Sequence, residues 1–202
     1  MQILYFLEDR AQEGFIKALV ERVATDEHVA LHHEIRSARH GSPRAIDEYK
    51  QFLKDAAGFR TFEADVLVVA IDGNCKGYRE MVKQLGGYLK PNHPLSQKVV
   101  YAVPDPHIER WYLMDQKAFK KGVGLDRAPD LPSYKCEKDH YKQIVNQSLK
   151  ESQVGSLLGG AEYAERIIEH IENLDALAAQ DPGFGSFVEA LRRRLRQSKG
   201  TR

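Results

Sequence analysis

Residues 65–71 read Asp65-Val66-Leu67-Val68-Val69-Ala70-Ile71, and this stretch is the clearest strand in the sequence. Every residue after the aspartate is apolar, so a strand here presents apolar side chains to both of its faces. Two apolar faces are typical of a central strand in a parallel sheet, because helices cover such a sheet on both sides. The stretch therefore predicts an α/β fold.

Strands and helices are expected to alternate on both sides of this stretch. Short apolar runs predict strands at 2–7, 29–35, 65–71 and 98–103. Apolar residues at helical spacing predict intervening helices at 12–24, 43–58 and 78–85, the second of them with Ser42 as its N-cap. Parallel strands joined by helices need right-handed crossovers, so this order predicts a doubly wound, mostly parallel sheet of about four strands.

The pattern changes in the second half of the chain. The fourth strand runs into Asp105-Pro106, which we expect to cap and open a helix. Glycines and prolines between 122 and 132 then predict a loop. Beyond this loop, apolar spacing predicts helices at 137–149, 161–178 and 184–196.

We therefore expect two parts. An α/β domain occupies residues 1–120, and a helical C-terminal extension with a basic tail occupies residues 121–202. The composition, with 42% hydrophobic and 29% charged residues, excludes a disordered chain. The net charge of +1 gives no global attraction to nucleic acid or to a membrane surface.

The chain shows no sign of export or of a membrane span. Its longest apolar runs are far shorter than the roughly 18–20 residues that cross a bilayer, and the first residues are not those of a signal peptide. Cys75 and Cys136 lack the C-x-x-C spacing of a zinc site or a redox motif. We expect neither a disulfide scaffold nor a cysteine-based metal site, and a reducing, cytoplasmic setting.

Positive charge is concentrated at the C-terminal end. The last eleven residues hold six basic residues and no acid. The candidates for contact with nucleic-acid phosphates are Arg192, Arg193, Arg194 and Arg196. The alternative is a solvated helix end whose positive charge complements the helix dipole.

Acids follow three of the four expected strands. Glu8 follows the first strand, Asp72 the third, and Asp105 and Glu109 the fourth. Because the carboxyl ends of parallel strands meet at one edge of the sheet, these acids are expected to lie together, where ligands bind. Oxygen ligands suit Mg²⁺ or Mn²⁺. The alternatives are a helix cap for Asp105, a dipole contact for Glu109 and turn chemistry for Asp72.

Other chemical motifs are weak. The sequence has neither a G-x-x-x-x-G-K-[ST] loop nor a G-x-G-x-x-G loop after a strand. His107-Ile108-Glu109 has the H-x-E spacing of zinc deaminases, but the P-C-x-x-C that follows in those enzymes is missing, so we reject that interpretation. We expect the histidines at 28, 32, 33 and 40 to be solvated or part of the core.

Three segments form a recognisable set of motifs. Residues 7–16, LEDRAQEGFI, are similar to the motif V-E-G-x-T-E-E-x-F, and residues 69–74, VAIDGN, are similar to a strand that ends in D-x-D. Residues 103–115, VPDPHIERWYLMD, are similar to I-P-x-x-x-I-E-x-W-L-L-x-D. In this order they resemble small standalone TOPRIM-like proteins of bacterial defence loci, relatives of the OLD-family nucleases. The resemblance covers about residues 1–118.

The resemblance implies a metal-dependent phosphodiesterase. It makes Glu8 and Asp72 ligands of Mg²⁺ (or Mn²⁺) and catalytic residues, with Glu109 as a further catalytic residue and Glu13 and Asn74 as supporting ligands. It also implies an ABC-type or SMC-like ATPase partner and a role in defence against phage.

The chain departs from the family pattern at three positions. Asp9 stands where the family has glycine, Gln12 where it often has an acid, and Asn74 where it has the second aspartate of D-x-D. Our leading hypothesis is a nuclease that cleaves DNA or RNA. The alternative is a catalytically degenerate subunit that binds an ATPase or a phage product and acts by assembly. Both hypotheses are compatible with a homo-oligomer. A third hypothesis is a receiver-like protein phosphorylated on Asp72.

Overall fold

A computed structural model describes residues 1–38, 44–58, 64–137 and 139–199. Ser42, the expected N-cap of the second helix, lies outside these ranges. Four strands and ten helices make up this part of the chain. In order they are β1 (Gln2–Leu7), α1 (Arg10–Asp26), β2 (His32–Ser37), α2 (Ala45–Gly58), β3 (Val66–Ala70), α3 (Tyr78–Gly87), β4 (Val99–Ala102), α4 (Ile108–Leu113), α5 (Gln116–Val123), α6 (His140–Glu151), the 3₁₀ helix η1 (Ala161–Tyr163), α7 (Ala164–Glu169), α8 (Leu174–Gln180) and α9 (Pro182–Lys199).

The four strands form one parallel sheet in the order β2-β1-β3-β4. The α/β fold class and all four expected strands are therefore confirmed. β1 and β3 are the central pair, and Tyr5 of β1 pairs with Ile35 on one side and Val68 on the other. All five residues of β3 are buried, as the two apolar faces of this stretch predict.

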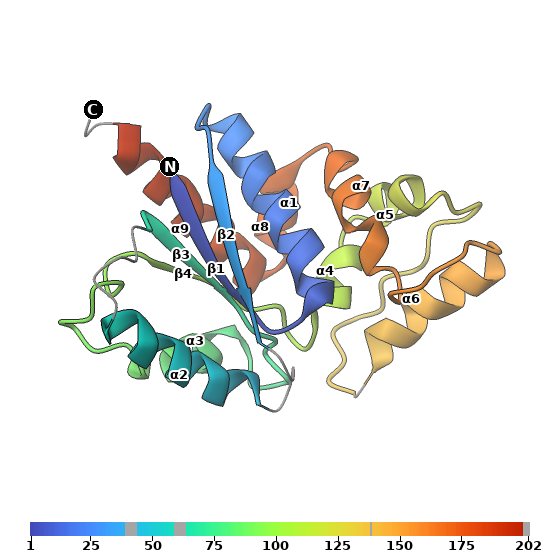
Figure 1. Ribbon diagram of the computed structural model, residues 1–202. Coiled ribbons are helices and arrows are strands. Elements are labelled where there is room, and N and C mark those ends of the chain that lie inside the picture. The colour runs from blue at the N-terminus through green and yellow to red at the C-terminus, as the bar shows by residue number, and fades with distance from the viewer. Residues whose placement is uncertain (39–43, 59–63, 138, 200–202) are drawn as a thin grey trace.

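Helices cover both faces of the sheet (Figure 1). On one face, Phe6 and Val69 pack with buried residues of α2 and α3, such as Leu53 and Leu85. On the other face, Tyr5 and its neighbours pack with α1 and with the helices from α4 to α9. This second cluster is the larger core, and it contains residues from both expected parts of the chain.

The helical extension therefore completes the α/β core. Trp111 of α4 packs edge-on against Phe184 of α9, with ring centroids 5.1 Å apart, and is stacked near Phe187 at 6.4 Å. Figure 1 shows that α9 runs behind the sheet and ends near the start of β1. No helix in the described ranges is both long and apolar enough to cross a membrane.

Two expectations about the helices were wrong. Residues 116–123, assigned in part to a loop, form α5, which Asp115 caps by accepting a hydrogen bond from the Ala118 N–H over 2.9 Å. The expected helix at 161–178 is broken into η1, α7 and α8. Asn173 is the N-cap residue of α8, because its side chain accepts a hydrogen bond from the Ala176 N–H.

Candidate metal centre

The first site residue, Glu8, is fixed by the strand that precedes it. Its backbone N–H donates to the Ala70 carbonyl over 3.0 Å, so the β1–β3 ladder continues one residue beyond β1. The same N–H lies 3.1 Å from Oε1 of Gln12 in the first turn of α1. Glu8 is 3% exposed, so its carboxyl group is held inside the protein at the carboxyl edge of the sheet.

Asp72 meets Glu8 at this edge. The backbone N–H of Asp72 donates to Oε2 of Glu8 over 2.8 Å, and Asp72 is itself 9% exposed. Two buried acids that follow neighbouring strands are thus joined by a hydrogen bond at one end of the sheet, as the positions of the acids in the sequence predict. Burial of two adjacent acids is costly unless hydrogen bonds or a cation compensate for the lost water.

Hydrogen bonds supply part of that compensation. The side-chain amide of Gln12 donates to Oδ1 of Asp72 over 2.7 Å, and Gln12 is fully buried. On the other side, Nδ1 of His107 lies 3.1 Å from Oδ2 of Asp72. Both carboxylate oxygens of Asp72 are therefore engaged by neighbouring side chains.

The surroundings shift the pKa values of the cluster. Burial, followed by the charge of Asp72, raises the pKa of Glu8 from 4.5 to about 7. Burial also raises the pKa of Asp72 to about 6, although the hydrogen bond with His107 opposes the shift. That same hydrogen bond raises the pKa of His107. Burial of the two carboxyl groups therefore favours their neutral forms.

His107 is the residue that sequence reasoning missed. It follows β4 and is the N-cap residue of α4, with an extended backbone at φ −145°. The signal was available, because His107 follows a strand end as the acids do, but His107 was considered only as part of the rejected H-x-E zinc motif.

The other residues that the sequence analysis placed at the site, Glu109, Asn74 and Glu13, lie in three different parts of the fold. Glu109 lies in the first turn of α4, and burial raises its pKa. Asn74 has a left-handed backbone, with φ 47°, and its side chain donates to the Asp72 carbonyl over 3.2 Å. Glu13 is half-buried in the first turn of α1, next to Gln12.

Asp9 replaces the glycine of the family pattern without backbone strain. Its backbone is extended, with φ −156°, a conformation open to any residue. Its Oδ1 accepts from the Gln12 N–H over 3.0 Å and caps α1. Asp9 therefore fixes the start of the helix that carries Gln12.

Asp105 is not the helix cap that the sequence predicted. The Asp105–Pro106 peptide bond is cis, and α4 begins only at Ile108. The Asp105 side chain instead accepts from the Cys75 N–H over 3.0 Å and from the Tyr134 hydroxyl over 2.7 Å. It thus ties the loop after Asp72 to a segment more than fifty residues further along the chain.

The two cysteines also correct a sequence-based expectation. Cys75 and Cys136 form a disulfide, with their Cα atoms 5.6 Å apart. Their separation of 61 residues gives no local motif, so the pairing was not expected from spacing. The bond joins the loop after Asp72 to the same distant segment that Asp105 contacts.

The basic tail lies away from the carboxylates. Arg196 makes two hydrogen bonds to the Glu27 carboxylate, of 2.6 and 2.9 Å, and Arg192 forms an ion pair with Asp175. Glu27 follows the end of α1, at the edge of the sheet opposite Glu8 (Figure 1). Arg193 and Arg194 belong to the same last part of α9.

Glu8 and Asp72 fit one hard cation better than two. In the residues that the structure describes, no group of three or more His, Cys, Asp or Glu side chains is placed to bind a metal ion. Mg²⁺ is commonly held by one or two carboxylates, with water and substrate phosphate as the remaining ligands. The residues present therefore suit a single Mg²⁺ or Mn²⁺ ion whose coordination a phosphate would complete.

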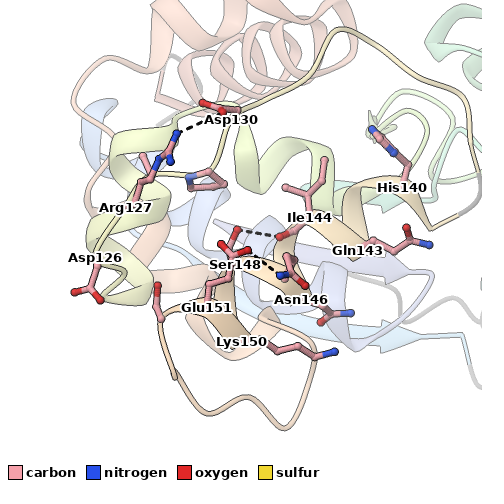
Figure 2. Close-up of a pocket in the computed structure, with 14 residues that line it drawn as sticks. Asp126, Arg127, Asp130, His140, Gln143, Ile144, Asn146, Ser148, Lys150 and Glu151 are labelled. Atoms are coloured by element: carbon pink, nitrogen blue, oxygen red, sulfur yellow. Dashed lines mark hydrogen bonds and ion pairs between the residues drawn. The ribbon is translucent and has the colours of Figure 1, made fainter.

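A well-formed cavity lies away from the carboxylate cluster. It has a volume of about 830 Å³, and residues 126–130 and α6 form most of its lining (Figure 2). Some of its polar side chains are paired, as in the Arg127–Asp130 ion pair and the hydrogen bond from Ser148 to the Ile144 carbonyl. It shares no lining residue with the carboxylate cluster.

Comparison of the chain with protein-family models, curated proteins and solved structures gives no match. The resemblance to TOPRIM-like proteins therefore depends on the three sequence segments alone.

Proposed function

We propose that this protein is a metal-dependent nuclease in which Glu8 and Asp72 hold one Mg²⁺ or Mn²⁺ ion. The observation that supports this most directly is the hydrogen bond of 2.8 Å from the Asp72 backbone N–H to the Glu8 carboxylate, which places these two buried acids next to each other at the end of the sheet. Ligands of open parallel sheets bind at this carboxyl edge, so substrate phosphate can reach the pair.

The surrounding residues have separate tasks. Gln12 and His107 orient Asp72 through its two oxygens, which fixes the direction of the carboxylate toward a ligand. The bound ion supplies an activated water and stabilises charge on the leaving oxygen. Glu109 lies one residue from Ile108 on the same turn as His107, and its raised pKa suits it to hold a proton near the site.

A second candidate function has its own support. Because Gln12 and His107 satisfy both oxygens of Asp72, the cluster is stable as a hydrogen-bonded network without a metal. This favours a degenerate TOPRIM-like subunit that binds an ABC-type or SMC-like ATPase or a phage product. Both functions belong to a cytoplasmic anti-phage system, and there the disulfide forms only under oxidising conditions.

A nucleic-acid cleavage assay distinguishes the two candidate functions. Plasmid DNA and total tRNA are incubated with Mg²⁺ or Mn²⁺ and wild-type protein, Glu8→Gln or Asp72→Asn, with and without the candidate ATPase. The matched control is Asp126→Asn, an exposed acid of the distant cavity. Loss of cleavage in the first two variants and not in the control supports the nuclease. Equal cleavage by all variants excludes the assigned residues, and no cleavage in any condition favours the non-catalytic subunit.

A further inference from the structure

A second cavity, of about 610 Å³, lies beside the carboxylate cluster. Asp105 belongs to its lining and also accepts a hydrogen bond from Cys75 in the loop after Asp72. Contact between Asp105 and this loop is so close that a Cβ at Gly73 would lie 2.3 Å from Oδ1 of Asp105. Asp105 therefore forms a shared wall between the cavity and the loop that follows Asp72.

The cavity has an aromatic and aliphatic lining. Tyr78 and Val103 form part of it, together with Pro182 at the start of α9 and the ring of Tyr134. Tyr134 is 51% exposed, and in the described part of the chain only Leu157 and Leu158 are other large apolar residues with such exposure. An exposed tyrosine ring at the mouth of a cavity offers a surface for stacking.

Three contacts hold Tyr134 in place. Its hydroxyl donates to Oδ2 of Asp105 over 2.7 Å, and the Arg110 guanidinium lies 5.6 Å from the ring centroid. Two residues further along the chain, Cys136 is joined to Cys75. A ring that is already immobilised loses little conformational entropy when a ligand stacks on it.

The charges around the cavity balance. The charged residues of the lining are three cations and three acids, namely Lys76, Arg79, Arg110, Glu80, Asp105 and Asp181. A balanced lining selects neither a phosphate nor a metal ion, and it suits an uncharged ring with polar edges. Arg110 is ion-paired with Asp181, so its charge is neutralised within the lining.

We propose that this cavity receives one unstacked base of a single-stranded nucleic acid, with the base lying on the ring of Tyr134. The proposal rests on the proposed function, because the strand attached to that base would lead its phosphates past the shared wall toward Glu8 and Asp72. Aromatic rings bind bases of any sequence. A base in a duplex is paired and stacked, so the site selects single strands.

The test is equilibrium binding in EDTA, which prevents metal-dependent cleavage. Fluorescence anisotropy follows labelled single-stranded DNA and RNA 12-mers, the same strands with abasic sites, and the DNA 12-mer as a duplex. We expect the abasic strands and the duplex to bind at least 5-fold more weakly than the intact strands. Tyr134→Ala should weaken binding of the intact strands by about 5- to 150-fold, the range for loss of one stacked base.

Matched variants separate stacking from folding. Tyr134→Phe keeps the ring and should bind within about 3-fold of wild type, whereas Leu158→Ala removes an exposed apolar residue elsewhere and should leave binding unchanged. Equal binding of intact and abasic strands, or wild-type affinity in Tyr134→Ala, overturns the base site, as does a complete lack of binding. Binding that depends on Tyr134, without cleavage, would support the base site and reject the nuclease. Cleavage without base-dependent binding would support the nuclease and reject the base site.

Discussion

The side chain of Gln12 donates a hydrogen bond to Oδ1 of Asp72 over 2.7 Å, at the position where the TOPRIM-like pattern often has an acid. A carboxylate cannot donate this bond and would add a third negative charge to two buried carboxyl groups. Gln12 therefore reduces repulsion in the cluster, and it does so by lowering the charge available to a cation. Replacing Gln12 with glutamate tests this effect.

Restoring the acid should lower stability and strengthen metal binding. We expect Gln12→Glu to reduce the free energy of unfolding in EDTA by about 2–4 kcal/mol, because a donor is lost and a buried charge is added. Mn²⁺ should raise the Tm of this variant more than that of wild type. Gln12→Met, which removes the hydrogen bonds without adding charge, is the control for stability and should show no gain from Mn²⁺. An equal Mn²⁺ response in Gln12→Glu and wild type would mean that this position does not face the ion.

Stability in EDTA should fall as the pH rises. The pKa of folded Glu8, about 7, is above its ordinary value of 4.5, so the folded state holds a proton that the unfolded state releases between these values. The raised pKa values of Asp72 and His107 act in the same direction. We expect the free energy of unfolding to decrease by roughly 1–3 kcal/mol between pH 4.5 and 7 from this cluster.

Chemical denaturation across this pH range measures the effect. Glu8→Gln keeps an oxygen that accepts from the Asp72 N–H but does not titrate, so its curve should be flatter than that of wild type. Mg²⁺ or Mn²⁺ should restore wild-type stability above pH 7, where both carboxylates are charged, and should leave Glu8→Gln less changed. A steeper decline in Glu8→Gln than in wild type would contradict the assigned cause.

The disulfide should contribute measurably to stability. It closes a long segment, with 61 residues of sequence separation, and such cross-links stabilise by about 2–4 kcal/mol through the unfolded chain. Reduction with a phosphine should therefore lower the Tm. The double variant Cys75→Ser/Cys136→Ser should match the reduced wild type and should not respond to the reductant. Free thiols on both cysteines in non-reduced wild-type protein, detected by mass spectrometry after alkylation, would refute the pairing.

Gly122 should tolerate no side chain. A Cβ at this position would lie 2.7 Å from the backbone nitrogen of Ile167, where α5 and α7 meet. We expect Gly122→Ala to reduce the free energy of unfolding by about 1–3 kcal/mol, the usual cost of overpacking. Gly87→Ala is the matched control, because a Cβ there meets nothing within 4 Å and the residue ends helix α3. Urea denaturation of the two variants measures the difference, and equal stability would rule out the close α5–α7 approach.

Periodicity predicted the elements whose surroundings are local. β3 is apolar on both faces and α1 has apolar residues at helical spacing, and each is observed where it was expected. α5 was missed because a glycine such as Gly122 is typical of a loop. In the structure this position is a glycine because the backbone of Ile167, forty-five residues further along the chain, leaves no room for a side chain. Close packing between helices that are distant in the sequence leaves no periodic pattern in the segment that carries the glycine.

The candidate site, too, could be predicted only in part from the sequence. Glu8 and Asp72 follow from a general property of parallel sheets, namely that strand ends converge at one edge. The roles of Gln12 and His107 depend on which side-chain atoms lie within hydrogen-bond distance of Asp72, and spacing in the sequence does not determine this. The same is true of Cys75 and Cys136, whose contact depends on the path of the chain beyond α5.

The packing of Trp111 against Phe184 and Phe187 also sets an order of events during synthesis. β1 leaves the ribosome long before α9, which covers the same core from the other end of the described chain. Until α9 is made, one face of the sheet has no complete cover, and Arg110 lacks its Asp181 partner. The nascent protein therefore carries Glu8 and Asp72 in an incompletely packed core until α9 has docked.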